Sequence, residues 1–140
     1  MASAIDAATL QAYRETRYRV LGEVPMTLRI DAPSTRLAAL HSALGVACSA
    51  FITAANPFSQ RCDDSANATR QQALAQDLAR LGLGTIGGAG EHPSNGWPAE
   101  PSYLVPGLSL EDARALGEKY GQNAVVWCGA DAVPRLVLLR

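Results

Sequence analysis

The stretch SAFITAANPFSQ, residues 49–60, offers the first set of side chains that could do chemistry. Its small and apolar first half is typical of a buried strand, which stops at Asn56 and Pro57. Proline restricts the residue before it, so Asn56 is expected in an extended conformation with its amide directed away from the strand. Ser59 and the first N–H groups of the next helix would then offer donors to an anion or a carbonyl. The alternative is that Asn56 and Ser59 only satisfy loop backbone groups.

A second set of reactive side chains lies in or beside the turn-rich hairpin of residues 88–99. Glu100 and His92 could act as base and acid, because a carboxylate and an imidazole exchange protons near neutral pH. Trp97 could stack on a ligand together with Phe58. The alternative is a solvated hairpin tip, where charged residues are common. Glu100 and Ser102 should share one face of the strand that follows the turn.

Other catalytic arrangements find less support. Cys62 and His92 could form a nucleophile–base pair, but no third residue is evident to orient them. The two histidines lack the spacing of a catalytic metal site, and neither a GxSxG nucleophile elbow nor a P-loop is present. We therefore expect no metal and no cofactor. His41, in a helix, is expected at the surface.

Basic residues gather in YRETRYR, residues 13–19, which contains Arg14, Arg17 and Arg19. Strand alternation places Arg17 and Arg19 on one face, and Arg29 could join them across a hairpin. Three arginines could bind a phosphate, and a solvated sheet face is the alternative.

Periodicity and end signals divide the chain into alternating elements. Helices are expected over residues 6–16, 34–44 and 63–82 and after Ser109, with strands over residues 18–21, 26–30, 48–54, 83–88, 102–105, 124–128 and 136–139. Residues 48–128 then read β-α-β-β-α-β, a ferredoxin-like unit with an N-terminal ββα extension and a C-terminal strand. The expected fold is a single α+β domain over residues 1–140, with a mixed sheet and helices on one face.

This topology gathers three polar connections at one end of the sheet. They are the loop around Asn56, the turn-rich stretch and the YGQN segment that contains Gln122 and Asn123. Asn67 also points to this end, because it begins the inward stripe of its helix, where an apolar residue is expected. Ligands commonly bind beyond the ends of strands in this way.

Composition limits the class of protein. The chain has 140 residues, 48% hydrophobic and 18% charged, which excludes a disordered protein. Its net charge of −1 argues against nucleic-acid binding. Three cysteines without a CxxC spacing, no signal peptide and no membrane-spanning stretch indicate a cytoplasmic protein. Weak homodimerisation through the sheet is also expected.

Several segments together resemble a known family. SAFITAANPFSQ, Asn67 with Gln71, GWPAEPSYLVPG and YGQNAVVW resemble a bacterial family of uncharacterised single-domain proteins, domain of unknown function 3293. The resemblance runs from about Tyr13 to Leu139, and its most specific part is the Asn-Pro-aromatic-Ser stretch. It implies a shared architecture and no activity. An aromatic often precedes Asn-Pro in the family, whereas this chain has Ala55.

We therefore predict a protein that binds a small polar or anionic metabolite at one end of the sheet. The predicted ligand-binding residues are Asn56, Phe58, Ser59, Asn67, Trp97, Glu100, Ser102, Gln122 and Asn123. Two alternatives remain open: an enzyme that uses Glu100 and His92 at the same end, and a protein-interaction module without a pocket.

Overall fold

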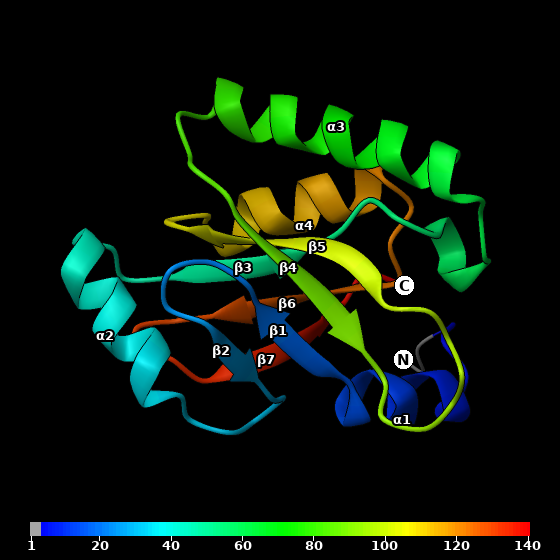
Figure 1. The fold of residues 1–140 in the computed structure, drawn as a ribbon, viewed down its shortest axis with the longest axis horizontal. Coiled ribbons are helices and arrows are strands. Elements are labelled where there is room, and N and C mark those ends of the chain that lie inside the picture. Colours follow the sequence, from blue (N-terminus) through cyan, green and yellow to red (C-terminus); the bar gives the residue numbers. More distant parts are fainter. Residues whose placement is uncertain (1–3) are drawn as a thin grey trace.

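A computed structural model describes residues 4–140, in which helices and strands alternate (Figure 1). The elements are α1 (Ala7–Glu15), β1 (Arg17–Val20), β2 (Met26–Leu28), α2 (Thr35–Leu44), β3 (Ser49–Ile52), the 3-10 turn η1 (Pro57–Ser59), α3 (Asp64–Arg80), β4 (Ile86–Glu91), β5 (Glu100–Pro106), α4 (Leu110–Lys119), β6 (Ala124–Cys128) and β7 (Pro134–Leu138). None of the helices in this part of the chain is long and apolar enough to cross a membrane.

The helix ends follow the capping residues of the sequence. Asp6, Ser34, Asp63 and Ser109 each cap a helix by accepting a backbone N–H from its first turn. Gly45 ends α2 in the left-handed conformation, with φ 67°. The predicted helices are therefore confirmed, to within two residues where both ends were predicted.

The predicted strand over residues 83–88 is displaced: β4 runs from Ile86 to Glu91. The segment is rich in glycine, which is a poor strand former. The strand continues because both of its edges are paired, with Gly88 opposite Val20 of β1 and Ser102 of β5. Tertiary pairing thus overrides the local preference.

The sheet has the strand order β2-β1-β4-β5-β3-β6-β7, and every neighbouring pair is antiparallel. The predicted mixed sheet was therefore wrong. The reason lies in β5, which pairs with both β3 and β4 and so separates these two strands, which helix α3 connects. The fold is α+β.

The predicted placement of all helices on one face was also wrong. Helices α3 and α4 cover one face, where Leu74, Leu78 and Leu116 pack on Ala50 and Ile52 of β3 (Figure 1). The opposite face is concave and holds a second cluster that includes Tyr18, Phe51 and Val126. Leu37 of α2 packs into this second cluster. Helices α1 and α2 lie at opposite ends of the sheet (Figure 1).

The concave face results from the curl of the sheet. Its two edges approach each other next to α2, where Asp31 N–H donates to the Pro134 carbonyl at 2.7 Å and Ser34 N–H to the Ala132 carbonyl at 3.2 Å. His41 of α2 is buried in this region, contrary to the surface position predicted for it, and hydrogen-bonds Ser49 at 2.8 Å. The concave face is thus closed by packing at its α2 end, and its cavity lies at the α1 end.

Candidate functional site

A cavity of about 340 Å³ lies between α1 and the concave face of the sheet. Its volume falls within the range of small-molecule sites, roughly 300–1,000 Å³. The apolar part of its lining includes Tyr18, Phe51, Val126 and Leu136. The polar part comprises Tyr13, Thr53, Asn56, Ser59, His92, Asn95, Trp97, Glu100, Ser102, Gln122 and Asn123, together with Thr9 and Thr16.

Asn56 is the centre of a hydrogen-bond network at the end of β3. Its backbone is left-handed, with φ 49° and ψ 61°, and not extended as predicted. Asparagine tolerates this conformation. The side-chain Nδ2 donates to Glu100 at 2.8 Å, while Oδ1 accepts from Cys62 N–H and from Asn67 Nδ2, both at 2.9 Å. These bonds hold Asn56 in place against the preference that Pro57 imposes.

Two amides on the inward face of α3 support the same loop. Asn67 Oδ1 accepts the backbone N–H of Asn56 at 2.9 Å, and Gln71 Oε1 accepts that of Ala54 at 2.6 Å. Beyond β3 these N–H groups have no strand partner, and buried N–H groups need an acceptor. The two polar residues that interrupt the apolar stripe of α3 therefore accept hydrogen bonds from backbone N–H groups where the chain leaves the sheet. Asn67 does not line the cavity, so it positions Asn56 and does not reach the ligand space.

The loop that follows is strained. Asn56, Phe58 and Ser59 have φ values of 49°, 59° and 56°. Each left-handed non-glycine residue costs about 1–3 kcal/mol and persists only where its surroundings determine it. Such residues cluster at ligand sites, which makes this loop a candidate part of a binding site.

Glu100 is the only carboxylate among the described residues that line the cavity. Its Oε2 accepts hydrogen bonds from Asn56 at 2.8 Å and from Trp97 Nε1 at 3.2 Å. Burial raises the pKa of this carboxyl group, and the two hydrogen bonds partly oppose that rise. No lysine or arginine of the described chain lines the cavity. Glu100 takes part in none of the ion pairs found among the described residues.

This environment gives a pH-dependent prediction. Glu100→Gln should raise the free energy of unfolding at pH 7 by about 1 kcal/mol, because glutamine keeps an acceptor for Asn56 and Trp97 and removes a desolvated charge. A raised pKa means that the folded state holds its proton more tightly, so the parent loses stability as pH rises from the ordinary value of 4.5 through the folded pKa. The advantage of the variant should therefore shrink towards pH 4.5.

Urea unfolding of both proteins between pH 4.5 and 7.5 measures this difference. Glu91→Gln is the matched control, since Glu91 is paired with Arg19 at 3.1 Å outside the cavity. If the Glu100→Gln variant were less stable than the parent at pH 7, the carboxylate of Glu100 in the parent would be well solvated or its charge compensated.

Helix α1 is fixed across the cavity by contacts at both of its sides. On one side, Asn123 Nδ2 donates to Tyr13 Oη at 3.1 Å and to Ser59 Oγ at 3.0 Å. On the other side, Glu15 bonds His92 Nε2 at 2.9 Å, and this bond lowers the pKa of Glu15. No residue of α1 is fully buried. The helix therefore covers the cavity through polar contacts at its rim.

The nitrogens of His92 are both occupied. Nδ1 accepts the backbone N–H groups of Ser94 and Asn95 at 3.1 and 3.0 Å, which places the ring proton on Nε2, facing Glu15. An imidazolium would have to break the two backbone bonds before it could donate from Nδ1. The geometry thus gives His92 a positioning role, and as the catalytic acid of the alternative enzyme hypothesis it would have no free nitrogen here.

The structure brings together seven of the nine predicted ligand-binding residues at the cavity: Asn56, Ser59, Trp97, Glu100, Ser102, Gln122 and Asn123. Phe58 does not line it; its ring is half-exposed and lies 4.5 Å from the guanidinium carbon of Arg140. Asn67 lies behind Asn56. Sequence reasoning missed Tyr13, Tyr18 and Phe51. Strand alternation could have identified Tyr18, since it must face opposite to Arg17 and Arg19.

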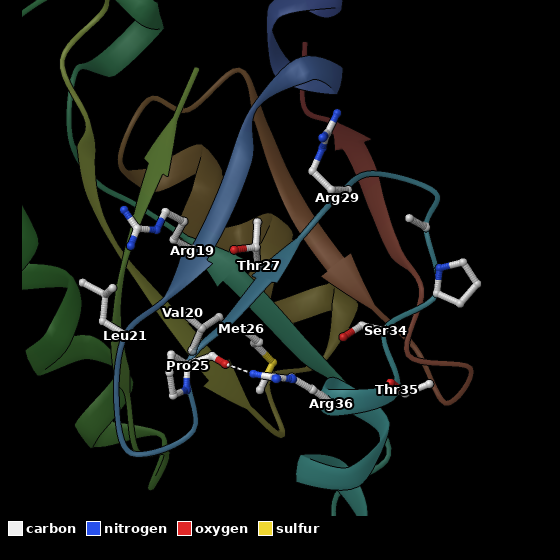
Figure 2. Close-up of a pocket in the computed structure, with 12 residues that line it drawn as sticks. Arg19, Val20, Leu21, Pro25, Met26, Thr27, Arg29, Ser34, Thr35 and Arg36 are labelled. Carbon is white, nitrogen blue, oxygen red and sulfur yellow. Dashed lines mark hydrogen bonds between the residues drawn. The ribbon is translucent and has the colours of Figure 1, made fainter. Parts of the chain in front are cut away.

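A larger hollow of about 510 Å³ is an open groove beside β2, lined by Arg19, Arg29 and Arg36 (Figure 2). Arg19 is paired with Glu91, and Arg36 donates to the Pro25 carbonyl at 2.7 Å. The three side chains point in different directions (Figure 2). A phosphate site needs converging donors, so the groove fits the solvated face better than the phosphate site considered above. Arg14 and Arg17 do not line it.

The described side chains also include no group of three or more His, Cys, Asp or Glu that could hold a metal ion. The site is defined instead by one half-buried carboxylate, a set of amides and an aromatic lining. It is a small cavity at the end of a curled antiparallel sheet, of a kind that can take a small molecule.

Comparison with known proteins gives the family. Residues 52–125 match the family described as "Protein of unknown function (DUF3293)", and the chain belongs to it. The matched segment extends from the end of β3 to the start of β6 and includes Asn56, Glu100 and Gln122, whereas α1 lies outside it. No curated protein and no solved structure matches the chain.

Proposed function

We propose that this protein binds a small polar metabolite in the cavity beneath α1. The observation that carries the proposal is the partly unsatisfied carboxylate of Glu100 inside that cavity, whose wall combines aromatic and aliphatic side chains with amides and hydroxyl groups. Binding sites commonly combine an apolar lining with a few positioned polar groups. The strained loop of Asn56 to Ser59 adds support, because it is held rigid where it meets the cavity.

The charge of the cavity lining restricts the chemical class of the ligand. The sequence left a neutral polar and an anionic metabolite open. An anion would need a lysine, an arginine or converging free N–H donors, and the described lining has no basic side chain apart from His92, whose nitrogens are occupied. We therefore place neutral and cationic compounds ahead of anionic ones.

A second candidate function is catalysis by Glu100. The favouring observation is its burial, which raises the pKa of the carboxyl group towards the range useful for proton transfer. Glu100→Gln would then abolish turnover while leaving affinity for an uncharged substrate within about tenfold. The cavity weighs against the third alternative, a flat interaction surface.

The architecture supports the proposal. We also propose that residues 48–128 form a ferredoxin-like unit. The element order β3-α3-β4-β5-α4-β6 and the sheet order β4-β5-β3-β6 support this proposal. That topology sends three connections to the end where α1 lies.

Free thiols at Cys48, Cys62 and Cys128 favour a reducing compartment, and we propose the cytoplasm.

The test is thermal unfolding of the protein against a panel of nucleosides, sugars, amines, amino acids, carboxylic acids and sugar phosphates. A ligand at a hundred times its Kd should add about 2.7 kcal/mol, roughly 10 °C for a chain of this size. Ala12→Leu should abolish the shift, because Ala12 lines the cavity.

Ala7→Leu is the matched control on the same helix, exposed and outside the cavity, and it should keep the shift. A shift that survives in Ala12→Leu would place the ligand elsewhere. If no compound shifts the parent, the protein is not a binder of these metabolite classes.

A further inference from the structure

The cavity lining offers a ligand more free hydrogen-bond acceptors than free donors. Asn56 uses its Nδ2 on Glu100, and Asn123 uses its Nδ2 on Tyr13 and Ser59. The Trp97 Nε1 is also used on Glu100. These amide and indole groups of the lining are therefore already engaged within the protein, whereas Asn95, whose Oδ1 accepts the Trp97 N–H, is exposed and keeps its Nδ2 for solvent or ligand.

Two side-chain oxygens of the amide and carboxylate groups in the lining have no hydrogen-bond partner among the described residues. Glu100 receives both of its hydrogen bonds on Oε2, so its Oε1 has no partner among the described residues. Gln122 donates from Nε2 to the carbonyls of Ala55 and Tyr120 at 3.0 and 3.3 Å, and its Oε1 likewise has no partner there. Both residues line the cavity. A ligand that satisfies them must supply hydrogen-bond donors.

The charge of Glu100 is also uncompensated by the protein. A half-buried carboxylate without a cation is costly unless something pairs with it. His92 is directed to Glu15, and none of the arginines of the groove lines the cavity. No described residue of the lining supplies this counter-charge, so a bound cation would stabilise the charged form of the carboxylate.

Aromatic side chains complete the environment. Tyr13, Tyr18, Phe51 and Trp97 line the same cavity, and aromatic rings attract cations within about 6 Å of their centres. Tyr18 and Phe51 pack edge to face, with ring centroids 5.4 Å apart, and so form a fixed wall. Carboxylate and aromatic groups together suit an onium group and repel an anion.

We infer that the ligand carries a protonated nitrogen, an ammonium or guanidinium group, which pairs with Glu100 and donates to Gln122 beneath α1. This inference rests on the proposed function and specifies its ligand class. The carboxylate of Glu100 pairs with the positive charge of the ligand, and Gln122 Oε1 accepts a further N–H from it. The aromatic wall holds the apolar remainder of the ligand.

Probes of equal shape and different charge test the inference. Benzylamine, benzyl alcohol and benzoate form one set, and butylamine, butanol and butyrate a second, with dissociation constants measured by NMR titration at pH 7. In the parent, each amine should bind at least tenfold more tightly than its alcohol, and each carboxylate more weakly than the alcohol. In Glu100→Gln the preference for the amine should fall to within about twofold.

Glu91→Gln is the matched control, because it removes a carboxylate outside the cavity and should keep the preference. Equal binding of amine and alcohol, tighter binding of carboxylate, or no binding of either amine to the parent would overturn the inference. So would a preference that survives Glu100→Gln. A neutral compound that shifts unfolding in the broader panel would preserve the proposed function while overturning the ligand class, so the two failures are distinguishable.

Discussion

Replacing Gly88 by alanine is expected to lower the free energy of unfolding by about 3 kcal/mol, roughly a 10 °C fall in Tm. A Cβ at Gly88 would lie 2.5 Å from the backbone oxygen of Arg19 and 3.0 Å from Cε2 of Phe51. The oxygen belongs to the neighbouring strand β1, so the clash can be relieved only by separating β1 from β4. Phe51 would be displaced at the same time.

Gly87→Ala is the matched control for this prediction. Gly87 is the preceding residue of β4, and a Cβ there would meet nothing within 4 Å. Its replacement should change stability by less than about 1 kcal/mol, in the stabilising direction, because alanine reduces the entropy of the unfolded chain. Urea unfolding of both variants measures the difference. Equal destabilisation by the two would mean that strand glycines, and not close approach at Gly88, decide the outcome.

The same close approach connects stability to the site. Phe51 lines the cavity and packs against Tyr18 of β1. Gly88 therefore brings the N-terminal strand close enough for its inward tyrosine to become part of the cavity wall. A variant that separates β1 from β4 should weaken ligand binding as well as folding.

Local signals predicted most of the fold. Caps such as Asp63 and Ser109 and the stripe of Leu74 and Leu78 act within one helix, so the sequence displays them directly. The pairing of β1 with β4 is not visible in this way, because it joins segments about 70 residues apart. The antiparallel sheet and the concave face both depend on such pairings, and these are the features that the sequence did not predict correctly.

The candidate site shows the same division. Glu100, Gln122 and Asn123 could be placed at one end because chain direction alone determines where their loops emerge. The direction of Phe58 depends on the left-handed conformations of Asn56 and of Phe58 itself, and this turn places its ring outside the cavity. Tyr13 joins the cavity only because α1 crosses that end, and no local pattern in the sequence specifies where α1 packs.

Asn67→Leu is expected to lower the free energy of unfolding by about 3 kcal/mol, although leucine would complete the apolar stripe of α3. The substitution leaves the buried N–H of Asn56 without an acceptor and removes a donor from its Oδ1. Each unsatisfied buried group costs about 1–3 kcal/mol, which exceeds what the added methyl groups contribute against a polar loop. Urea unfolding measures the loss.

Gln72→Leu provides the comparison on the exposed face of the same helix, where it should change stability by less than about 0.5 kcal/mol. If Asn67→Leu instead stabilised the protein, the amide network would not be what holds the loop. If it destabilises as expected, Asn56 becomes free to leave its left-handed conformation, and its Nδ2 no longer has a fixed direction towards Glu100. Asn67→Leu should then also weaken the selectivity for an amine over its alcohol, although Asn67 does not line the cavity. This outcome would link the polar interruption of α3 to the chemistry of the cavity.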